Sequence, residues 1–187
     1  MKRFMSGLAA FALTTPLALG AANAQETYQT GREGVTFGIG IGGGTITCGD
    51  EGCDDLEGAG SLDLHVGGML SPGLALLFDA WWMLHTEDRF TVDQGILTAA
   101  IRAWPISHFW LQGGLGVARA GIKYDGQFFD AESRTEWVPA FHVGIGVEPI
   151  ATDTFGLDVS LRYGTGFYSD GEDRIHNASL NVGVSFY

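Results

Sequence analysis

The end of the chain, residues 175–187, alternates strictly between apolar and small or polar side chains. Such a period of two predicts a β-strand with one apolar face. Chain ends usually fray, but the last strand of a closed barrel has the first strand as its partner. We therefore expect this strand to pair with residues 34–47. Its apolar face carries Ala178, Leu180, Val182, Val184 and Phe186, and its polar face carries Asn177, Ser179, Asn181, Gly183, Ser185 and Tyr187.

The same alternation recurs along the chain between turn signals. Connections around 71–73, 105–108 and 151–154 are short, whereas 48–57 and 125–136 are longer and polar, and 87–89 and 169–174 are charged. Short turns on one side and polar loops on the other are typical of an up-and-down membrane barrel. The pattern predicts an all-β fold, an eight-stranded antiparallel up-and-down transmembrane β-barrel over residues 34–187. Its strands are expected at 34–47, 58–70, 74–86, 90–106, 109–124, 137–150, 155–168 and 175–187.

Residues 1–24 have the pattern of a secretory signal peptide. Lys2 and Arg3 precede an apolar stretch from Leu8 to Leu19, and Ala22 and Ala24 form a small-x-small cleavage site. Residues 25–33 are then expected to be a short periplasmic tail. Beyond residue 24 no apolar run approaches the roughly 20 residues of a spanning helix, so a membrane would have to be crossed by strands.

Composition supports a small barrel. The 187 residues include 29 glycines and 12% aromatic residues, and the net charge of −12 argues against nucleic-acid binding. Aromatic residues gather at both ends of the expected strands, as in interfacial belts. A soluble barrel or sandwich with its aromatic residues inside is the alternative. One belt would hold Trp104, Phe109, Trp110, Phe155, Phe186 and Tyr187, and the other Phe90, Tyr124, Phe128, Phe129, Trp137, Phe167 and Tyr168.

In its export signal, strand pattern, loop asymmetry and aromatic end, the chain resembles the eight-stranded outer-membrane barrels, in particular the OmpA-like transmembrane domain. The resemblance implies the bacterial outer membrane, with both termini periplasmic. It also implies outer-membrane lipid, lipopolysaccharide and the barrel-assembly machinery as partners, an unknown extracellular ligand bound through the loops, and no cofactor. The chain departs from these families in that Tyr187 lies one place beyond the aromatic that shares the apolar face. No peptidoglycan-binding domain follows residue 187, so cell-wall anchoring is not expected.

The inward faces of the expected strands carry charged side chains. An eight-stranded barrel is just wide enough for side chains to fill it, and buried charges must be paired. We expect a salt-bridged interior in which each arginine meets one or two carboxylates. A gated pore or a proton path is the alternative. The network comprises Asp63, His65, Asp79, Arg102, His142, Glu148, Asp158 and Arg162, joined by Gln112.

The first long loop combines two cysteines with acidic residues. Cys48 and Cys53 are expected to form a disulfide in an exported chain, with zinc binding as the weaker alternative because no histidine is near. The carboxylates of this loop could hold Ca²⁺ or bridge divalent cations to lipopolysaccharide; otherwise they form a solvated acidic loop. They are Asp50, Glu51, Asp54, Asp55 and Glu57.

Together these features favour a non-enzymatic outer-membrane barrel with a structural or loop-mediated binding or adhesion role. A narrow pore or a conduit for small hydrophobic molecules is the alternative. A third hypothesis is a lipid A-modifying enzyme, because some barrels of this size use a His and a Ser near the outer leaflet. His176 and Ser179 are three residues apart on one strand and so point to opposite faces. His85 and Ser169 would meet only if their loops converge.

Overall fold

We describe a computed structural model of the chain, which covers residues 31–48, 56–125, 130–168 and 173–187. These residues form strands joined by turns, and no helix among them is long and apolar enough to cross a membrane. The strands are β1 (Val35–Cys48), β2 (Leu56–Ser71), β3 (Leu74–Glu87), β4 (Phe90–Ile106), β5 (Phe109–Asp125), β6 (Asp130–Arg134), β7 (Val138–Ala151), β8 (Phe155–Tyr168) and β9 (Asp173–Phe186).

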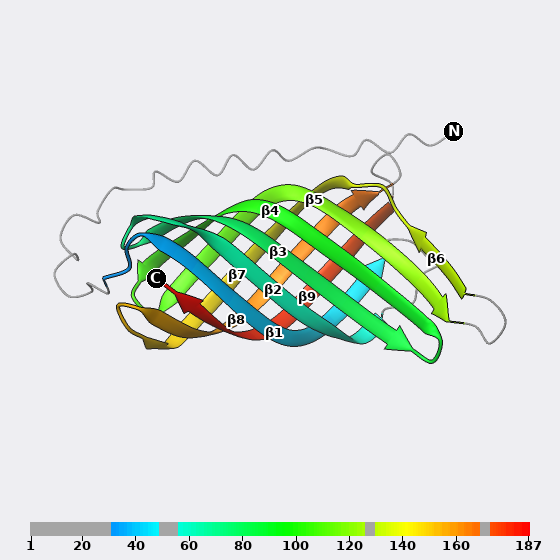
Figure 1. Cartoon of the computed structure of the whole chain (residues 1–187), viewed down its shortest axis with the longest axis horizontal. Coiled ribbons are helices and arrows are strands. Elements are labelled where there is room, and N and C mark those ends of the chain that lie inside the picture. The colour runs from blue at the N-terminus through cyan, green and yellow to red at the C-terminus, as the bar shows by residue number, and fades with distance from the viewer. Residues whose placement is uncertain (1–30, 49–55, 126–129, 169–172) are drawn as a thin grey trace, which may run out of the picture.

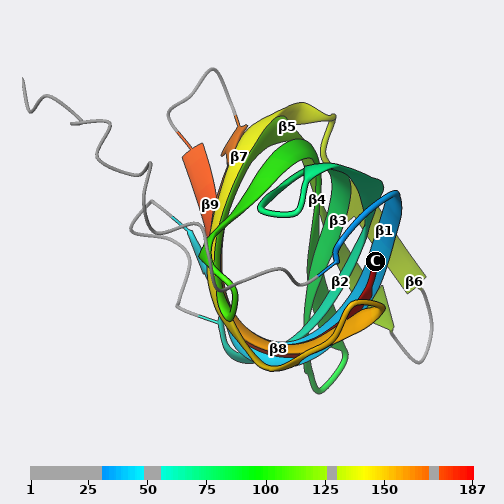
Figure 2. The ribbon, with the colours of Figure 1, turned by 90° about the vertical axis from the view of Figure 1, so that its left-hand side faces the viewer.

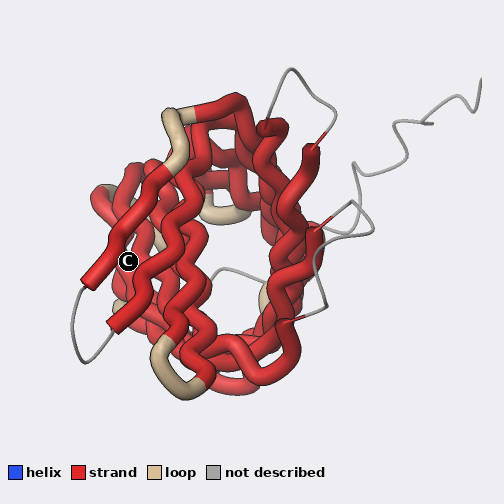
Figure 3. Tube along the Cα trace, turned by 90° about the vertical axis from the view of Figure 1, so that its right-hand side faces the viewer, coloured by secondary structure: helices blue, strands red, loops and turns tan. Residues whose placement is uncertain are grey.

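Eight of the strands close a single antiparallel barrel. The order is β4-β3-β2-β1-β9-β8-β7-β5, and an additional β4–β5 pairing completes the ring. The last strand pairs with the first, from Phe37 opposite Phe186 to Cys48 opposite Ile175, as the sequence pattern predicts. The start of β1 and the C-terminus lie at one end of the barrel (Figure 1). End-on views from that end (Figure 2) and from the other (Figure 3) show the ring of strands.

Strand β6 departs from the sequence-based expectation of a polar loop at 125–136. It pairs with β5 alone, with Arg134 opposite Gly121 and Asp130 opposite Asp125. The hairpin β4–β5 therefore continues past the barrel as a small sheet with β6 at its edge. A strand of mostly charged side chains, Asp130–Arg134, has no apolar face for a pattern to reveal, which is why the periodicity missed it. We call this end of the barrel the loop end and the opposite one the terminal end.

The faces of the barrel are inverted relative to a soluble protein. Large apolar side chains point outward and are exposed, for example Phe37 at 53%, Leu76 at 51% and Leu115 at 75%. Charged and amide side chains are buried inside, for example Asp79 and Asn177 at 0%. An extensive exposed apolar surface wrapped around a polar interior suits lipid rather than water. The soluble alternative would require the opposite arrangement.

Small inward residues make room for large inward neighbours. A Cβ on Gly146 would lie 2.4 Å from the Trp110 ring, and one on Gly40 would lie 2.3 Å from the Asp63 carboxylate. Such contacts are far inside van der Waals separation, so a side chain at either position would displace its neighbour. Alternation of glycine with bulky residues is thus what lets eight strands enclose a filled interior.

The aromatic belts differ in part from those expected. Trp104 and Trp110 point into the barrel and are 7% and 0% exposed, and Tyr168 is buried as well. At the terminal end, Phe186 instead stacks on Phe37 with ring centroids 5.0 Å apart. Aromatic residues exposed toward the loop end are Phe90 and Trp137, as expected, together with Trp82 and Tyr163. The sequence could not separate the two faces of a strand end, because aromatic residues suit both a packed interior and an interface. Phe128 and Phe129 lie outside the described residues.

Candidate functional site

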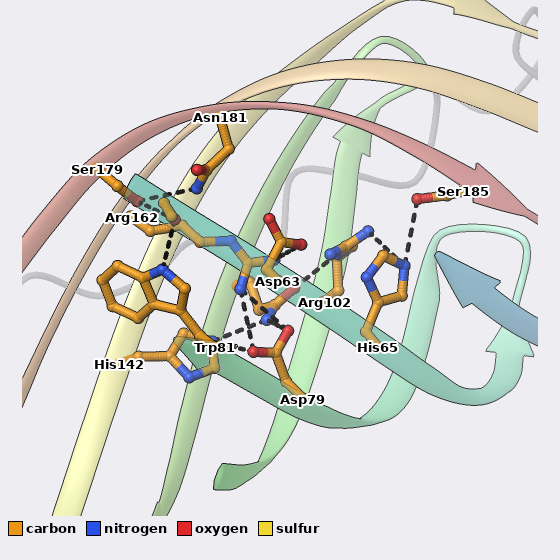
Figure 4. A network of polar contacts seen from close by, with 12 residues as sticks. Asp63, His65, Asp79, Trp81, Arg102, His142, Arg162, Ser179, Asn181 and Ser185 are labelled. Carbon is orange, nitrogen blue, oxygen red and sulfur yellow. Dashed lines mark hydrogen bonds and ion pairs between the residues drawn. The ribbon is translucent and has the colours of Figure 1, made fainter. Parts of the chain in front are cut away.

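The interior at mid-height is a cluster of charged and amide side chains that we call the central polar cluster. It comprises Asp63, His65, Asp79, Arg102, His142 and Arg162, labelled in Figure 4, and Gln112, which hydrogen-bonds to Arg102 and Asp79. They come from inward positions of six strands, with Asp63 and His65 both on β2. Its main ion pairs are made by Arg162 of β8. Its Nη1 donates to Asp79 Oδ1 and Oδ2 at 3.0 and 3.1 Å, and its Nη2 donates to Asp63 Oδ1 at 3.0 Å.

A chain of hydrogen bonds extends from Asp79 across the lumen. Gln112 Nε2 donates to Asp79 Oδ2 at 2.9 Å and contacts His142 Nε2 at 2.8 Å. An amide nitrogen only donates, so His142 Nε2 is the acceptor and its Nδ1 carries the proton. That proton is donated to Thr98 Oγ1, 2.9 Å away. One hydrogen-bond network therefore joins side chains from four strands, β3, β4, β5 and β7.

The sequence predicts that Arg102 pairs with carboxylates, but its partners in the structure are neutral or aromatic. Its Nε donates to Gln112 Oε1 at 2.7 Å, and its Nη1 lies 3.5 Å from His65 Nε2. The guanidinium stacks on Trp110, 4.3 Å from the ring centroid. Within the described part of the chain Arg102 forms no ion pair with a carboxylate. An arginine can be stabilised by aromatic faces and neutral acceptors, and sequence alternation alone does not distinguish these from carboxylates.

Asp158 and Glu148 lie inside the barrel but outside this cluster. Asp158 of β8 is 6% exposed and faces the backbone of Gly183 on the neighbouring strand. Glu148 of β7 is 0% exposed and lies at the terminal end. There it forms an ion pair with Arg32 Nη2 and accepts a hydrogen bond from Trp104 Nε1 at 2.9 Å.

Arg32 is the interior residue that sequence reasoning placed in a polar tail. Its side chain is 1% exposed, and its Nη2 also donates to the Ser107 carbonyl at 2.8 Å. The guanidinium lies between the Trp104 and Tyr187 rings, 4.9 and 5.0 Å from their centroids. An arginine a few residues before the first strand is too common a pattern to predict that its side chain is buried. We call Arg32, Trp104, Glu148 and Tyr187 the terminal cluster.

An apolar layer fills the interior on the loop side of the central polar cluster. The Trp81 indole is its largest member, and its Nε1 donates to Ser61 Oγ at 2.9 Å, joining the layer to the polar cluster below. Further toward the loop end, Gln94 Nε2 donates to Tyr168 Oη at 2.8 Å. The layer consists of Ile46, Ala59, Trp81, Met83, Ile96, Ala118 and Ala140, with Val138 and Ile175 packed against it.

The residues considered for catalysis do not meet. His176 is on the outward face of β9, where its Nδ1 lies 2.8 Å from the Tyr163 hydroxyl. Ser179 points inward and receives hydrogen bonds from Asn181 Nδ2 and Ser61 Oγ. His85 lies near the loop end, 3.8 Å from Glu87, and Ser169 lies outside the described residues.

The loop chemistry expected from the sequence lies largely outside the structure. Cys53, Asp50, Glu51, Asp54 and Asp55 are not among the described residues, so the disulfide with Cys48 and the divalent cation site stay predictions. In the part of the chain that is described, no group of three or more His, Cys, Asp or Glu side chains is arranged to hold a metal ion.

Comparisons with known proteins agree with this geometry. The family described as "Outer membrane protein beta-barrel domain" matches residues 11–186. No curated protein gives a match. Among solved structures, Ail, the attachment invasion locus protein of Yersinia pestis, is 15% identical, with a TM-score of 0.61 over 82% of this chain and 99% of that one. Its complex with the heparin analogue sucrose octasulfate gives 15% identity and a TM-score of 0.60 over 83% and 99%. Neisserial surface protein A is 13% identical, with a TM-score of 0.60 over 81% and 96%.

Proposed function

This chain belongs to the family of outer membrane protein β-barrel domains, and we propose that it works from the outer surface of a bacterium as a structural or adhesive protein whose loops bind a partner. The observation that carries this proposal is the filled interior. In a barrel with a filled interior, a partner can contact only the loops and the outward face.

The interior is closed at three successive levels. The terminal cluster occupies one mouth, with Arg32 and Glu148 both buried. The central polar cluster follows, with Arg162 bound to two carboxylates. Above it lies the apolar layer around Trp81 and Met83, both 0% exposed. Ions would have to displace paired charges and then cross an apolar layer, which opposes the narrow-pore and conduit alternatives.

The charge of the loops indicates the kind of partner. Acidic residues outnumber basic ones at the loop end, where 14 carboxylates face Arg89, Arg119, Lys123, Arg134 and Arg174, while Arg32, Arg102 and Arg162 are buried inside. Complementary charge attracts partners and suppresses wrong ones. A basic protein surface on a host cell or neighbouring cell suits these loops. The acidic residues are Asp50, Glu51, Asp54, Asp55, Glu57, Glu87, Asp88, Asp125, Asp130, Glu132, Glu136, Asp170, Glu172 and Asp173.

The same charge argues against transferring a ligand by similarity of fold. Ail is known in complex with a heparin analogue, sucrose octasulfate. A polysulfated ligand would be repelled by the acidic loops of this chain, and the identity of 15% supports a shared fold only.

This proposal places both termini in the periplasm and the loop end outside, because short turns lie on the periplasmic side of such barrels. Outer-membrane lipid and lipopolysaccharide then surround the barrel, and the barrel-assembly machinery inserts it. We assign it no catalytic role, since His176 and Ser179 lie on opposite faces of β9.

Adhesion by cells that express the protein tests the proposal. A non-adherent bacterial host carrying the protein is compared with the same host carrying a vector, on cultured epithelial cells and on immobilised poly-lysine. We expect increased binding that falls when Asp50, Glu51, Asp54 and Asp55 are replaced by Asn or Gln. Asp153→Asn in the opposite turn is the matched control and should bind as wild type. The proposal would be contradicted if the vector host, or the host carrying the neutralised loop variant, adhered as strongly as the host carrying the wild-type protein.

A further inference from the structure

Residues 31–34 precede β1 and run from it over the terminal end of the ring (Figure 2). Gly34 has a φ of 79°, a left-handed conformation that suits glycine, and there the chain turns away from the line of β1. Within the described residues, two hydrogen bonds hold the backbone of this segment. The Gly34 carbonyl accepts from Met69 N at 2.8 Å, and Gly31 N donates to Asp153 Oδ1 at 2.9 Å. The segment belongs to no strand, and we call it the N-terminal strap.

The strap sends one side chain into the barrel. Of its four residues only Arg32 is buried. The Nη2 atom of Arg32 donates to the carbonyl of Ser107, in the turn between β4 and β5, and β5 lies opposite β1 in the closed ring of eight strands. The same atom pairs with Glu148 of β7. Arg32 therefore reaches across the terminal mouth from the side on which the strap leaves β1.

The pocket that receives Arg32 is formed by the barrel itself. Glu148 Oε2 faces the Arg32 guanidinium, whereas Glu148 Oε1 accepts hydrogen bonds from Trp104 Nε1 at 2.9 Å and from Tyr187 Oη at 2.7 Å. These two bonds fix the carboxylate and both aromatic rings against one another without any contribution from Arg32. The pocket is thus preorganised, and departure of the strap would leave its three walls tied together.

The chemistry of this pocket matches a guanidinium. The Trp104 and Tyr187 ring centroids lie 4.9 and 5.0 Å from Arg32 Cζ. A planar cation stacks on such faces and directs its N–H groups at the carboxylate and the Ser107 carbonyl. An ammonium is compact and strongly hydrated, and it lacks the flat face. A neutral amide has the flat face but no charge to offset the buried Glu148.

We propose that Trp104, Glu148 and Tyr187 form a guanidinium-binding site that Arg32 fills in cis, which makes the N-terminal strap a displaceable lid on the terminal mouth. Two backbone hydrogen bonds and one side chain hold the strap, whereas β1 is paired along its length on both edges. A buried carboxylate without its cation is costly, so the lid opens when a second guanidinium, such as an arginine of another polypeptide, replaces Arg32. The lid and the loops lie at opposite ends of the barrel, so this proposal and the proposed adhesion can fail separately.

Calorimetric titration of methylguanidinium into the purified protein in detergent tests the site. Arg32→Ala empties the pocket, and a shift in gel mobility between unboiled and boiled samples verifies that the variant is folded. We expect saturable binding of one methylguanidinium to Arg32→Ala, with a roughly millimolar Kd for so small a ligand. Wild type, whose site is filled, should bind about tenfold more weakly or less, because a short tether gives Arg32 a roughly millimolar effective concentration. Methylammonium and methylurea should each bind Arg32→Ala about tenfold more weakly than methylguanidinium.

A matched pair of double variants separates this site from general attraction of cations. Arg32→Ala with Glu148→Gln removes the carboxylate of the pocket, and we expect it to lose methylguanidinium binding. Arg32→Ala with Glu33→Gln removes the exposed neighbouring carboxylate of the strap and should bind as Arg32→Ala does. Absence of binding to folded Arg32→Ala, or binding that survives Glu148→Gln, would overturn the site.

A spin label on the strap tests the lid in protein that keeps Arg32. The label is attached to Glu33→Cys in a background in which Cys48 and Cys53 are serine. We expect an immobilised spectrum that becomes mobile in Arg32→Ala and stays unchanged in Arg174→Ala, which removes an outward arginine on the Phe167 ring. Methylguanidinium at about 100 mM, well above the effective concentration of the tether, should mobilise the label, and methylurea at the same concentration should not. An immobile label in Arg32→Ala, or equal mobility with the two compounds, would overturn the lid.

Discussion

The hydroxyl of Tyr187 donates a hydrogen bond of 2.7 Å to Glu148 Oε1. The last residue of the chain is therefore tied to β7, although the strand that precedes it pairs with β1 and β8. Phe186 keeps the outward face and stacks on Phe37. Tyr187, one place beyond, turns to the interior and covers Arg32. The apparent overhang of one residue is thus an inward anchor that joins both ends of the barrel chain.

Removal of that hydroxyl tests the anchor. Tyr187→Phe leaves the Glu148 carboxylate short of a buried donor, so we expect the free energy of unfolding to fall by about 1.5–3 kcal/mol, the range for hydrogen bonds to charged groups. Urea unfolding in lipid vesicles, followed by tryptophan fluorescence, measures the change. Tyr163→Phe is the control: its hydroxyl contacts His176 on the exposed face, and we expect a loss below about 1 kcal/mol. Equal losses in the two variants would argue against the anchor.

Arg162 holds the central polar cluster together. Its replacement by Met leaves the carboxylates of Asp63 and Asp79 buried without their cation, and breaking a buried pair in this way costs about 3–5 kcal/mol. We expect Arg162→Met to destabilise by that amount in the same unfolding assay. The double variant Arg162→Met with Asp79→Asn should recover part of the loss, because one unpaired charge is removed. Arg174→Met, on the exposed face, should cost under about 1 kcal/mol. A double variant no more stable than Arg162→Met would contradict this account of the ion pairs.

The disulfide in the first long loop is tested by thiol labelling. An exported chain with Cys48 and Cys53 close in sequence is expected to be oxidised. Iodoacetamide applied to denatured protein should then add no mass before reduction and two carbamidomethyl groups after it. Labelling of both cysteines without reductant would show that the bridge is absent.

Orientation in the membrane is tested with epitope insertions in two turns. One epitope is placed between Asp88 and Arg89, at the loop end, and one next to Pro72, at the terminal end. On intact cells we expect an antibody to stain only the first, and on permeabilised cells both. Staining of the Pro72 insertion alone on intact cells would reverse the orientation and remove the basis of the proposed function.

Much of the barrel could be predicted from the sequence because a strand with one lipid face and one interior face has a period of two. The expected strands at 90–106 and 155–168 coincide with β4 and β8, and the others differ by a few residues at most. Alternation also identified which charged residues point inward. Asp63, Asp79 and Arg162 illustrate this, since each occupies the interior face of its strand.

The partners inside the barrel could not be predicted in the same way. Alternation gives the face of a residue, but its height depends on strand tilt and register. Glu148 therefore lies at the terminal end with Arg32 instead of beside Arg102, which rests on Trp110. The sequence did not reveal that Trp104 points inward, because a tryptophan at a strand end suits an interfacial belt equally well. Arg32 precedes the first strand and has no periodic neighbour that could reveal its burial.

The filled interior is the central claim, and conductance tests it most directly. Purified protein is inserted into planar lipid bilayers and recorded at single-channel resolution over a range of voltages and salt concentrations, with insertion verified by protease protection in matched vesicles. The terminal cluster, the central polar cluster and the apolar layer around Trp81 together predict a flat current trace for inserted wild-type protein. Reproducible single-channel steps from the wild-type barrel would contradict a closed interior and favour the pore instead.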